Sequence, residues 1–293
     1  MSTSSFRKLF HRAEAGTPVP PVLLIGPHRS GTTLITACLE QAGLFVGAEL
    51  DPNKEAQYFL RLNDWMLNQA GCRWDLPGEF ERLFAHPGLR AKITEQMRRM
   101  MTSASASAYL GRKPPRGSAG VSGIGGPWGW KDPRNCFTLP VWLDLFPDAK
   151  VVFVRRHGAD AAASLTTRSL SVLERWKPRN KLFPSDMVTD SARCLSLDGA
   201  FMLWVDYMQA AEKNTRGLGD RLFCIQYEEF LSHPADCLRN LIAFCGLYVD
   251  ERTENAIITG IRTERAFAYR SVPELMTLSG RRTAELAAFG YAP

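Results

Sequence analysis

Residues 22–33, with the sequence Val-Leu-Leu-Ile-Gly-Pro-His-Arg-Ser-Gly-Thr-Thr, constrain the fold of this 293-residue chain more than any other stretch. The four apolar residues predict a strand buried on both faces, and the glycine-bounded loop after them leads into the start of a helix. In that arrangement, backbone N–H groups and a helix N-terminus point toward one place, which is a way to bind phosphate without a metal. The stretch therefore predicts a phosphate-binding loop between a strand and a helix.

The spacing of this loop separates it from the loop of nucleotide triphosphatases. Four residues lie between Gly26 and Gly31, as in those enzymes, but the position after Gly31 holds Thr32 instead of lysine. The cation of the loop is Arg29, whose forked and permanent charge suits a phosphate. Hydroxyl groups that can also donate are those of Ser30, Thr32 and Thr33. We expect a phosphate other than the β- and γ-phosphates of ATP; an ordinary turn with Thr33 as helix cap is the alternative.

Further segments predict an alternation of strands and helices. Strands are expected at residues 128–133, 150–156 and 221–227, and helices at residues 33–41, 55–70, 89–110, 141–146, 159–167, 190–213 and 234–245. Residues 111–127, rich in Gly and Pro, predict a flexible loop, and residues 170–189 an irregular segment. The fold class expected is α/β, a parallel sheet of the phosphate-loop kind with helices on both faces. Residues 1–20 are expected to form a flexible arm before a single domain over residues 21–293.

Composition narrows the classes of partner. The net charge of +6 suits an anionic ligand, but no dense block of Lys and Arg predicts nucleic-acid binding; scattered surface charge is the plain alternative. No signal-peptide pattern is visible, and no apolar run reaches the ~18 residues that a membrane span needs, so a cytoplasmic protein is expected. The seven cysteines form no Cys-x-x-Cys pair or Cys/His cluster, which predicts free thiols and no metal site.

Two more candidate positions follow predicted strands. Ligands of open parallel sheets bind beyond the carboxyl ends of the strands. Arg156 is expected as the last residue of its strand, with Ser164 eight residues later in the next helix, and the two can hold a second phosphate. Tyr227 ends the third long strand and can pack on a purine. The alternatives are a structural hydrogen bond for Arg156 and plain packing for Ser164 and Tyr227.

Together these motifs resemble those of the sulfotransferases that use 3′-phosphoadenosine 5′-phosphosulfate (PAPS). Residues 26–33 look like the 5′-phosphosulfate loop of that family, in the variant with Arg at position 29, and residues 154–165 look like its 3′-phosphate segment. The resemblance assigns the 3′-phosphate to Arg156 and Ser164, covers residues 22–248, and is strongest to the bacterial and tyrosylprotein-like branch. Other matching stretches are Trp130-Lys131-Asp132-Pro133, residues 146–150, and residues 227–230 with His233-Pro234. The chain departs from the family's Asp-Gly-Arg-Asp at residues 157–160, and Arg155 is an unusual extra cation.

The resemblance implies a reaction and roles for particular residues. PAPS donates its sulfonate to a hydroxyl, or to an amine, by in-line transfer without a metal, and adenosine 3′,5′-bisphosphate (PAP) leaves. Arg29 and Lys131 are expected to stabilise the developing charge, an ion pair with Asp132 being the alternative for Lys131. A carboxylate base is expected at Glu49, with Glu55 and then His28 as alternatives. The residues expected to contact the donor are His28, Arg29, Ser30, Gly31, Thr32, Thr33, Arg156, Ser164 and Tyr227.

The acceptor and the competing functions stay open at this point. A small-molecule or glycan acceptor is expected, with carbohydrate preferred; residues 111–127 and the aromatic residues Tyr58, Trp65 and Trp176 are candidates to line its cleft. Peptide tyrosine, lipid and small metabolites also fit, and the oligomeric state is open. A nucleotide or sugar kinase is one alternative function. This chain, however, lacks the lysine that such a kinase has after the second loop glycine, and it shows no clear aspartate at a strand end for Mg²⁺. A non-catalytic PAP-binding protein is the other.

Overall fold

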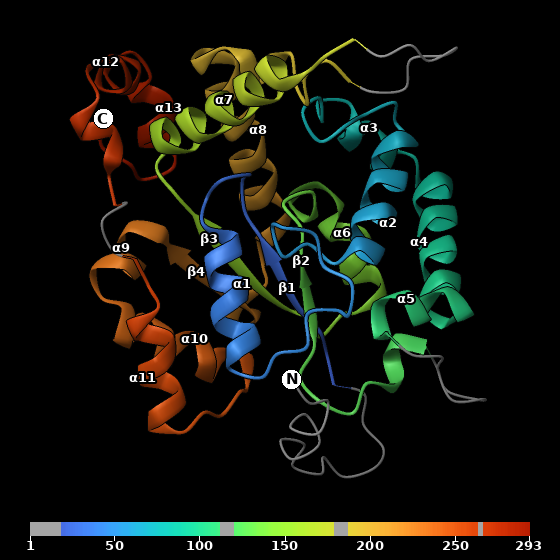
Figure 1. The fold of residues 1–293 in the computed structure, drawn as a ribbon. Helices are drawn as coiled ribbons and strands as arrows, with labels where there is room; N and C mark the ends of the chain where they lie inside the picture. Colours follow the sequence, from blue (N-terminus) through green and yellow to red (C-terminus); the bar gives the residue numbers. More distant parts are fainter. Residues whose placement is uncertain (1–18, 112–119, 179–186, 263–265) are drawn as a thin grey trace.

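A four-stranded parallel sheet forms the centre of the computed structural model, which describes residues 19–111, 120–178, 187–262 and 266–293. The strands are β1 (Val22–Ile25), β2 (Gly129–Lys131), β3 (Lys150–Arg155) and β4 (Leu222–Gln226), in the order β2-β1-β3-β4 (Figure 1). Val22 of β1 aligns with Gly129 of β2 and with Lys150 of β3, so the carboxyl ends of the strands lie at one edge. This confirms the predicted parallel α/β sheet.

Helices cover both faces of the sheet because successive strand residues point to opposite sides. Val22 and Leu24 pack into one core with α1 (Thr32–Gln41), α9 (Tyr227–Ser232), α10 (Pro234–Cys245) and α11 (Glu251–Thr259). Leu23 and Ile25 belong to a larger core on the other face. That core is built with α2 (Gln57–Asn68), α3 (Phe80–Ala85), α4 (Pro87–Thr102), α5 (Ser107–Leu110), α6 (Asn135–Leu145), α7 (Gly158–Arg175), α8 (Leu197–Thr215), α12 (Pro273–Arg281) and α13 (Thr283–Ala288).

Several predicted helix boundaries are wrong. The helix predicted over residues 89–110 breaks at Ser103, whose hydroxyl accepts a hydrogen bond from the N–H of Ser105 and starts the short 3₁₀ turn Ala104–Ala106. The helix predicted over residues 190–213 begins only at Leu197, because the Ser196 hydroxyl caps it by accepting from the N–H of Gly199. The helix predicted over residues 141–146 instead begins at Asn135 and contains Pro140.

The segment predicted to be irregular over residues 170–189 is also partly helical. Helix α7 packs against α8 and continues to Arg175, beyond its last buried residue, Ser169. Residues 179–186 of that segment lie outside the described residues, as do residues 112–119 of the predicted flexible loop and residues 1–18 of the predicted arm. None of the helices in the described ranges combines the length and the apolarity that crossing a lipid bilayer requires.

Candidate active site

The loop between β1 and α1 turns sharply enough to require both of its glycines. Gly31 has φ +92° and is the N-cap of α1, and a Cβ on it would lie 2.2 Å from the ring of Tyr227. A Cβ on Gly26 would lie 2.2 Å from the carbonyl oxygen of Val154. Thr33 is not the helix cap, because its hydroxyl donates to the carbonyl oxygen of Asn53 at 3.1 Å. The first turn of α1 therefore has no side-chain cap, and its N–H groups face the carboxyl edge of the sheet.

The two predicted phosphate motifs meet at this edge, although they lie far apart in the sequence. The Nε of Arg29 donates to the hydroxyl of Ser164 at 2.8 Å, and Nη1 of Arg156 donates to the carbonyl oxygen of Arg29 at 3.2 Å. The prediction that Arg156 ends this strand is wrong. Strand β3 ends at Arg155, and Arg156 lies in the turn before α7. There Arg156 also lies 3.6 Å from the carboxylate of Asp160. One cluster of cations thus joins the loop to the start of α7.

The ring of Tyr227 packs against this cluster. The residue begins α9 directly after β4, and its ring is buried. The guanidinium of Arg156 lies 4.9 Å from the centre of the Tyr227 ring, and Gly31 packs on the ring's edge. The ring therefore holds the loop and Arg156 at a fixed separation.

A buried ion pair stands at the end of β2. Lys131 is only 2% exposed, and its Nζ donates to a carboxylate oxygen of Glu55 at 2.8 Å and to the carbonyl oxygen of Asn53 at 3.0 Å. The alternative of a surface pair with Asp132 is wrong. Because Thr33 and Lys131 share the Asn53 carbonyl as acceptor, the ammonium group lies beside the first turn of α1.

Arg134 completes the buried charges and was missed by the sequence analysis. Its Nη1 lies 3.3 Å from the second carboxylate oxygen of Glu55 and 3.0 Å from Asp132, and its Nε lies 2.7 Å from Asp64. Buried charges are stable only when paired in this way. The sequence did contain a signal for Arg134: it is a cation three residues after Lys131, in the turn Asp132-Pro133-Arg134 that follows the strand.

The two predicted carboxylates differ in their surroundings. Glu55 contacts Lys131 and Arg134, and burial raises the pKa of its carboxyl against the opposing effect of these two cations. Glu49 is exposed, and its carbonyl oxygen accepts a hydrogen bond from the N–H of Gln57 at the start of α2. Of the two, Glu55 is therefore the one that contacts the predicted catalytic cation.

His28 lies in the loop with its imidazole buried between aromatic rings. The ring centre lies 4.8 Å from that of Trp74 and 5.2 Å from that of Tyr207, both edge to face. Burial, and then the charges of Arg134, Lys131, Arg168 and Arg29, hold the pKa of His28 well below its usual value. The imidazole is therefore neutral near pH 7.

A second buried histidine fixes the turn between β3 and α7. His157 stacks on Tyr269 with 4.0 Å between ring centres, and its backbone N–H donates to the carboxylate of Glu228 at 2.8 Å. Asp160 accepts a hydrogen bond from the N–H of Tyr269 at 2.8 Å. The residues that depart from the family pattern at 157–160 thus tie the C-terminal part of the chain to the site.

These two histidines make stability depend on pH. Burial also lowers the pKa of His157, so below about pH 6.5 the unfolded chain binds protons that the folded chain does not. We expect the free energy of unfolding to fall between pH 7 and 5.5, by up to about 1.4 kcal/mol per pH unit for each histidine. Urea unfolding of the wild type and of His157→Gln measures this: the slope should shrink in the variant and stay unchanged in the control His233→Gln, which alters an exposed side chain that does not cap its helix. Equal slopes in all three proteins would contradict the expectation.

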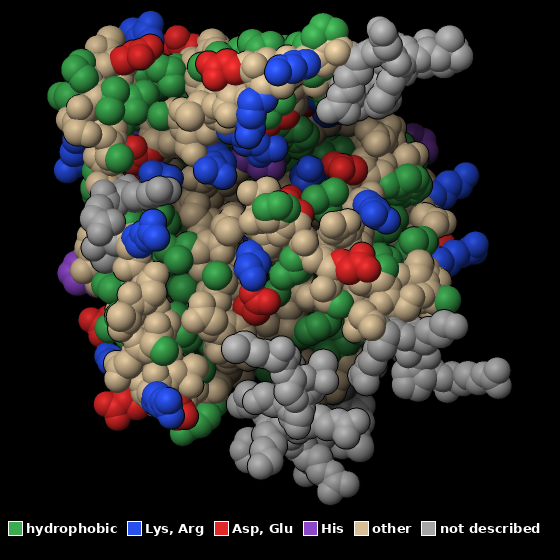
Figure 2. Space-filling view, viewed as in Figure 1, with side chains coloured by type: hydrophobic (Ala, Val, Ile, Leu, Met, Phe, Trp, Pro, Cys, Tyr) green, Lys and Arg blue, Asp and Glu red, His purple; other side chains and the backbone are tan. Residues whose placement is uncertain are grey.

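In Figure 2, Lys and Arg side chains gather with a His around a recess in the face below α7.

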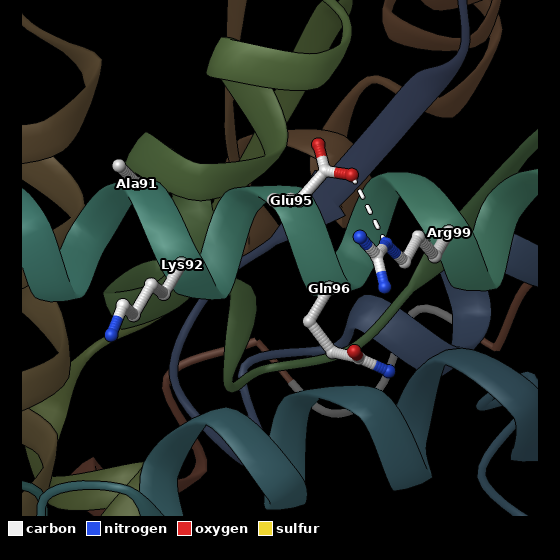
Figure 3. Close-up of a pocket in the computed structure, with 5 residues that line it drawn as sticks. All are labelled: Ala91, Lys92, Glu95, Gln96 and Arg99. Carbon is white, nitrogen blue, oxygen red and sulfur yellow. Dashed lines mark hydrogen bonds and ion pairs between the residues drawn. The ribbon is translucent and has the colours of Figure 1, made fainter.

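Two of the hollows that described residues form lie outside the predicted motifs. One hollow of about 490 Å³ is lined by Arg73, Asp75, Leu76, Met187, Val188, Thr189, Ala192 and Arg193. The other, on the exposed face of α4, is lined by Ala91, Lys92, Glu95, Gln96 and Arg99, of which Glu95 and Arg99 form an ion pair (Figure 3). None of the predicted site residues lines either hollow.

The three aromatic residues predicted to line an acceptor cleft differ in exposure. Tyr58 is buried and donates to the carbonyl oxygen of Met100, whereas Trp65 and Trp176 are partly exposed. Among the described residues, no three His, Cys, Asp or Glu side chains come together as metal ligands. The seven cysteines, all within the described ranges, are unpaired.

Comparison with known proteins decides the family. Residues 20–251 match the sequence profile described as the Sulfotransferase family. The chain belongs to the sulfotransferase family. This match covers both predicted phosphate motifs and the Lys131–Glu55 pair, so the family predicted from the motifs is confirmed. No curated protein matches the sequence of this sulfotransferase.

Solved sulfotransferases resemble this one in fold at low sequence identity. STF9 from Mycobacterium avium is 15% identical, with a TM-score of 0.48 over 94% of this chain and 78% of its own. The sulfotransferase domain of the Synechococcus PCC 7002 olefin synthase is 18% identical, with a TM-score of 0.48 over 94% and 98% of the two chains. Mouse SULT7A1, solved with PAP, is 14% identical, with a TM-score of 0.44 over 93% and 89%.

Proposed function

We propose that this sulfotransferase transfers a sulfonate group from PAPS to a hydroxyl or amine of an acceptor and releases PAP. The observation that carries the proposal is the contact between the two phosphate motifs, in which Arg29 binds Ser164 and Arg156 binds the Arg29 carbonyl. A donor with a phosphate at its 3′ position and an anionic group at its 5′ position needs two cationic sites side by side. These two motifs supply them at one edge of the sheet.

Buried polar atoms of the loop fit such an anion. The hydroxyl of Ser30 is fully buried, and no described residue forms a hydrogen bond with it. The N-terminus of α1, ten residues long, adds N–H groups that no side chain caps. We therefore assign the 5′-phosphosulfate to residues 26–33 and the 3′-phosphate to Arg156 and Ser164.

The chemistry then follows from where negative charge develops. The acceptor oxygen forms a bond to sulfur, the bond from sulfur to the bridging oxygen breaks, and its electron pair stays on the 5′-phosphate of PAP. Fixed cations beside that oxygen stabilise the transition state more than the ground state. Arg29 and Lys131 take this role in our proposal. Glu55 uses both of its oxygens to hold Lys131 and Arg134, which makes it a positioning residue.

The two ends of the donor can be tested separately with nucleotides. Arg156→Ala is expected to weaken PAP binding by about 10- to 100-fold, because it removes a charge-assisted contact of about 1.5–3 kcal/mol. Binding of adenosine 5′-monophosphate, which lacks the 3′-phosphate, should change less than 3-fold. Isothermal titration calorimetry measures both, with Lys92→Ala on α4 as the control. Equal weakening of the two nucleotides would contradict the assignment of Arg156 to the 3′-phosphate.

The acceptor is proposed from the resemblance as a carbohydrate hydroxyl, acted on in the cytoplasm. A donor carrying radioactive sulfur, incubated with a panel of glycans, peptides and small alcohols, tests the class of acceptor. Label in glycans alone supports the proposal, and label in peptides or small alcohols alone replaces carbohydrate with that class. PAP binding without label in any acceptor would favour a non-catalytic nucleotide-binding protein.

A further inference from the structure

The imidazole of His28 has an unusual combination of position and surroundings. It is only 8% exposed, and among the described residues no hydrogen-bond partner reaches its Nε2. The next residue along the chain is Arg29, which contacts Ser164. Lys131 and Arg29, the two cations assigned to the donor, are among the charges that act on this imidazole, so the ring lies close enough to the proposed donor site to feel an anion there.

The aromatic walls around His28 do not satisfy its nitrogen. Trp74 and Tyr207 meet the imidazole edge to face. The hydroxyl of Tyr207 donates to the carbonyl oxygen of Trp74 at 2.8 Å, so that proton is already in use. A buried nitrogen without a partner costs free energy, which a ligand hydroxyl donating to it would recover. The Nε2 atom is thus suited to accept a hydrogen bond from a group with an O–H bond.

The charges that face His28 come from four different elements. Arg29 lies in its own loop, Lys131 at the end of β2, Arg134 before α6 and Arg168 on α7. Tyr207 of α8 is uncharged, because burial raises its pKa well above 10. Each cation outside the loop has a carboxylate partner: Lys131 and Arg134 share Glu55, and Arg168 lies 2.7 Å from Asp190. The positive charges keep the imidazole unprotonated, as a proton acceptor must be.

The same charges weaken the imidazole as a base until an anion arrives. A phosphate and a sulfonate placed among Arg29, Lys131 and Arg134 oppose their effect on His28, so its pKa rises. Proton uptake by His28 would then accompany donor binding. The carboxylate of Glu55 cannot serve the same purpose as readily, because Lys131 and Arg134 engage both of its oxygens.

We infer that His28 accepts the proton of the acceptor hydroxyl, and that it becomes an effective base only when the donor is bound. In this step the O–H proton moves to Nε2, the acceptor oxygen forms its bond to sulfur, and the bond from sulfur to the bridging oxygen breaks. The electron pair of that bond leaves with PAP, whose negative charge stabilises the imidazolium. The inference rests on the proposed function and assigns the base to the loop instead of to Glu49 or Glu55.

Nuclear magnetic resonance tests the coupling without an acceptor. In protein labelled with ¹⁵N-histidine, the His28 signals are identified by their absence from His28→Gln. Without ligand, the pKa of His28 should lie below 6.5, and saturating PAP should raise it, while PAP at a fixed pH should leave the signals of the exposed His86 in place. A His28 pKa that PAP leaves unchanged overturns the inference.

Kinetics test the role in the reaction. Water serves as the acceptor, and release of labelled sulfate from PAPS reports turnover. His28→Gln should lower kcat by about 10²- to 10⁴-fold, the range for loss of a general base, and should abolish the acidic limb of the pH profile. Its affinity for PAP should stay within 3-fold of the wild type, and His86→Gln should resemble the wild type in every measurement.

The outcomes separate this inference from the function on which it rests. A wild type that neither binds PAP nor releases sulfate from PAPS contradicts the proposed function itself. A wild type that does both, with a His28→Gln variant that is equally fast, contradicts only the role of His28. If His28→Gln fails to fold, as thermal unfolding would show, the wild-type titration with PAP still decides. The His28 signals are then identified by elimination, because single Gln variants of the other four histidines, His11, His86, His157 and His233, assign the remaining signals.

Discussion

Replacing Lys131 with methionine is expected to lower kcat for sulfonate transfer by about 10²- to 10³-fold, the usual cost of removing one transition-state donor. The ammonium group lies beside the first turn of α1, through the Asn53 carbonyl that it shares with Thr33. In our proposal it acts mainly on the sulfonate during transfer, and PAP lacks that group. PAP affinity should therefore change less than 3-fold while turnover falls.

The buried partner of Lys131 complicates this variant in a predictable way. Glu55 keeps Arg134 when Lys131 is replaced, so the carboxylate retains one cation in the folded protein. We expect a loss of stability near the lower end of the about 3–5 kcal/mol that breaking a buried pair costs. Lys92→Met, on the exposed face of α4, is the matched control. Wild-type turnover in folded Lys131→Met would remove Lys131 from the mechanism.

Replacing Gly26 with alanine is expected to destabilise the protein by about 3 kcal/mol, the upper end of the usual range for overpacking a rigid site. The new Cβ would lie 2.2 Å from the carbonyl oxygen of Val154. That oxygen belongs to the main chain of β3, beside β1 in the sheet, and cannot move away as a side chain can. The φ of +148° at Gly26 adds backbone strain.

Gly43 offers the matched control for this second prediction. It has φ +99°, also unfavourable for alanine, but a Cβ there would meet no atom within 4 Å. Gly43→Ala should therefore cost only the backbone term, about 1–2 kcal/mol. Urea unfolding of the two variants separates the clash from the strain. Equal destabilisation would mean that the contact with Val154 contributes nothing.

The local motifs were the most predictable part of this sulfotransferase. The strand Val22–Ile25, the loop after it and the parallel sheet follow from short runs of apolar residues and from glycine spacing. Such patterns are read within about ten residues, because strand burial and turn geometry are local requirements. Helix ends were predicted less well: α7, for example, extends to Arg175, well beyond its predicted end.

Contacts between distant residues were beyond the reach of the sequence. Lys131 and Glu55 are 76 residues apart, and Arg29 and Ser164 are 135 residues apart. The sequence offered Asp132 as the partner of Lys131 because it is the adjacent carboxylate. The fold instead brings the start of α2 against the end of β2, where a buried ammonium group needs a carboxylate that is buried with it.

The amino-acid sequence by itself determined the residue types of the two predicted phosphate motifs and the parallel sheet that brings them toward one edge. Only the tertiary structure decided that the two predicted phosphate motifs touch, that Arg134 joins the buried charges, and that His28 is neutral with no hydrogen bond to its Nε2 from any residue of the described ranges. The physical reason is that residue type and spacing set local conformation. Burial, and with it the ionisation and pairing of each charged group, depends on every element packed around it.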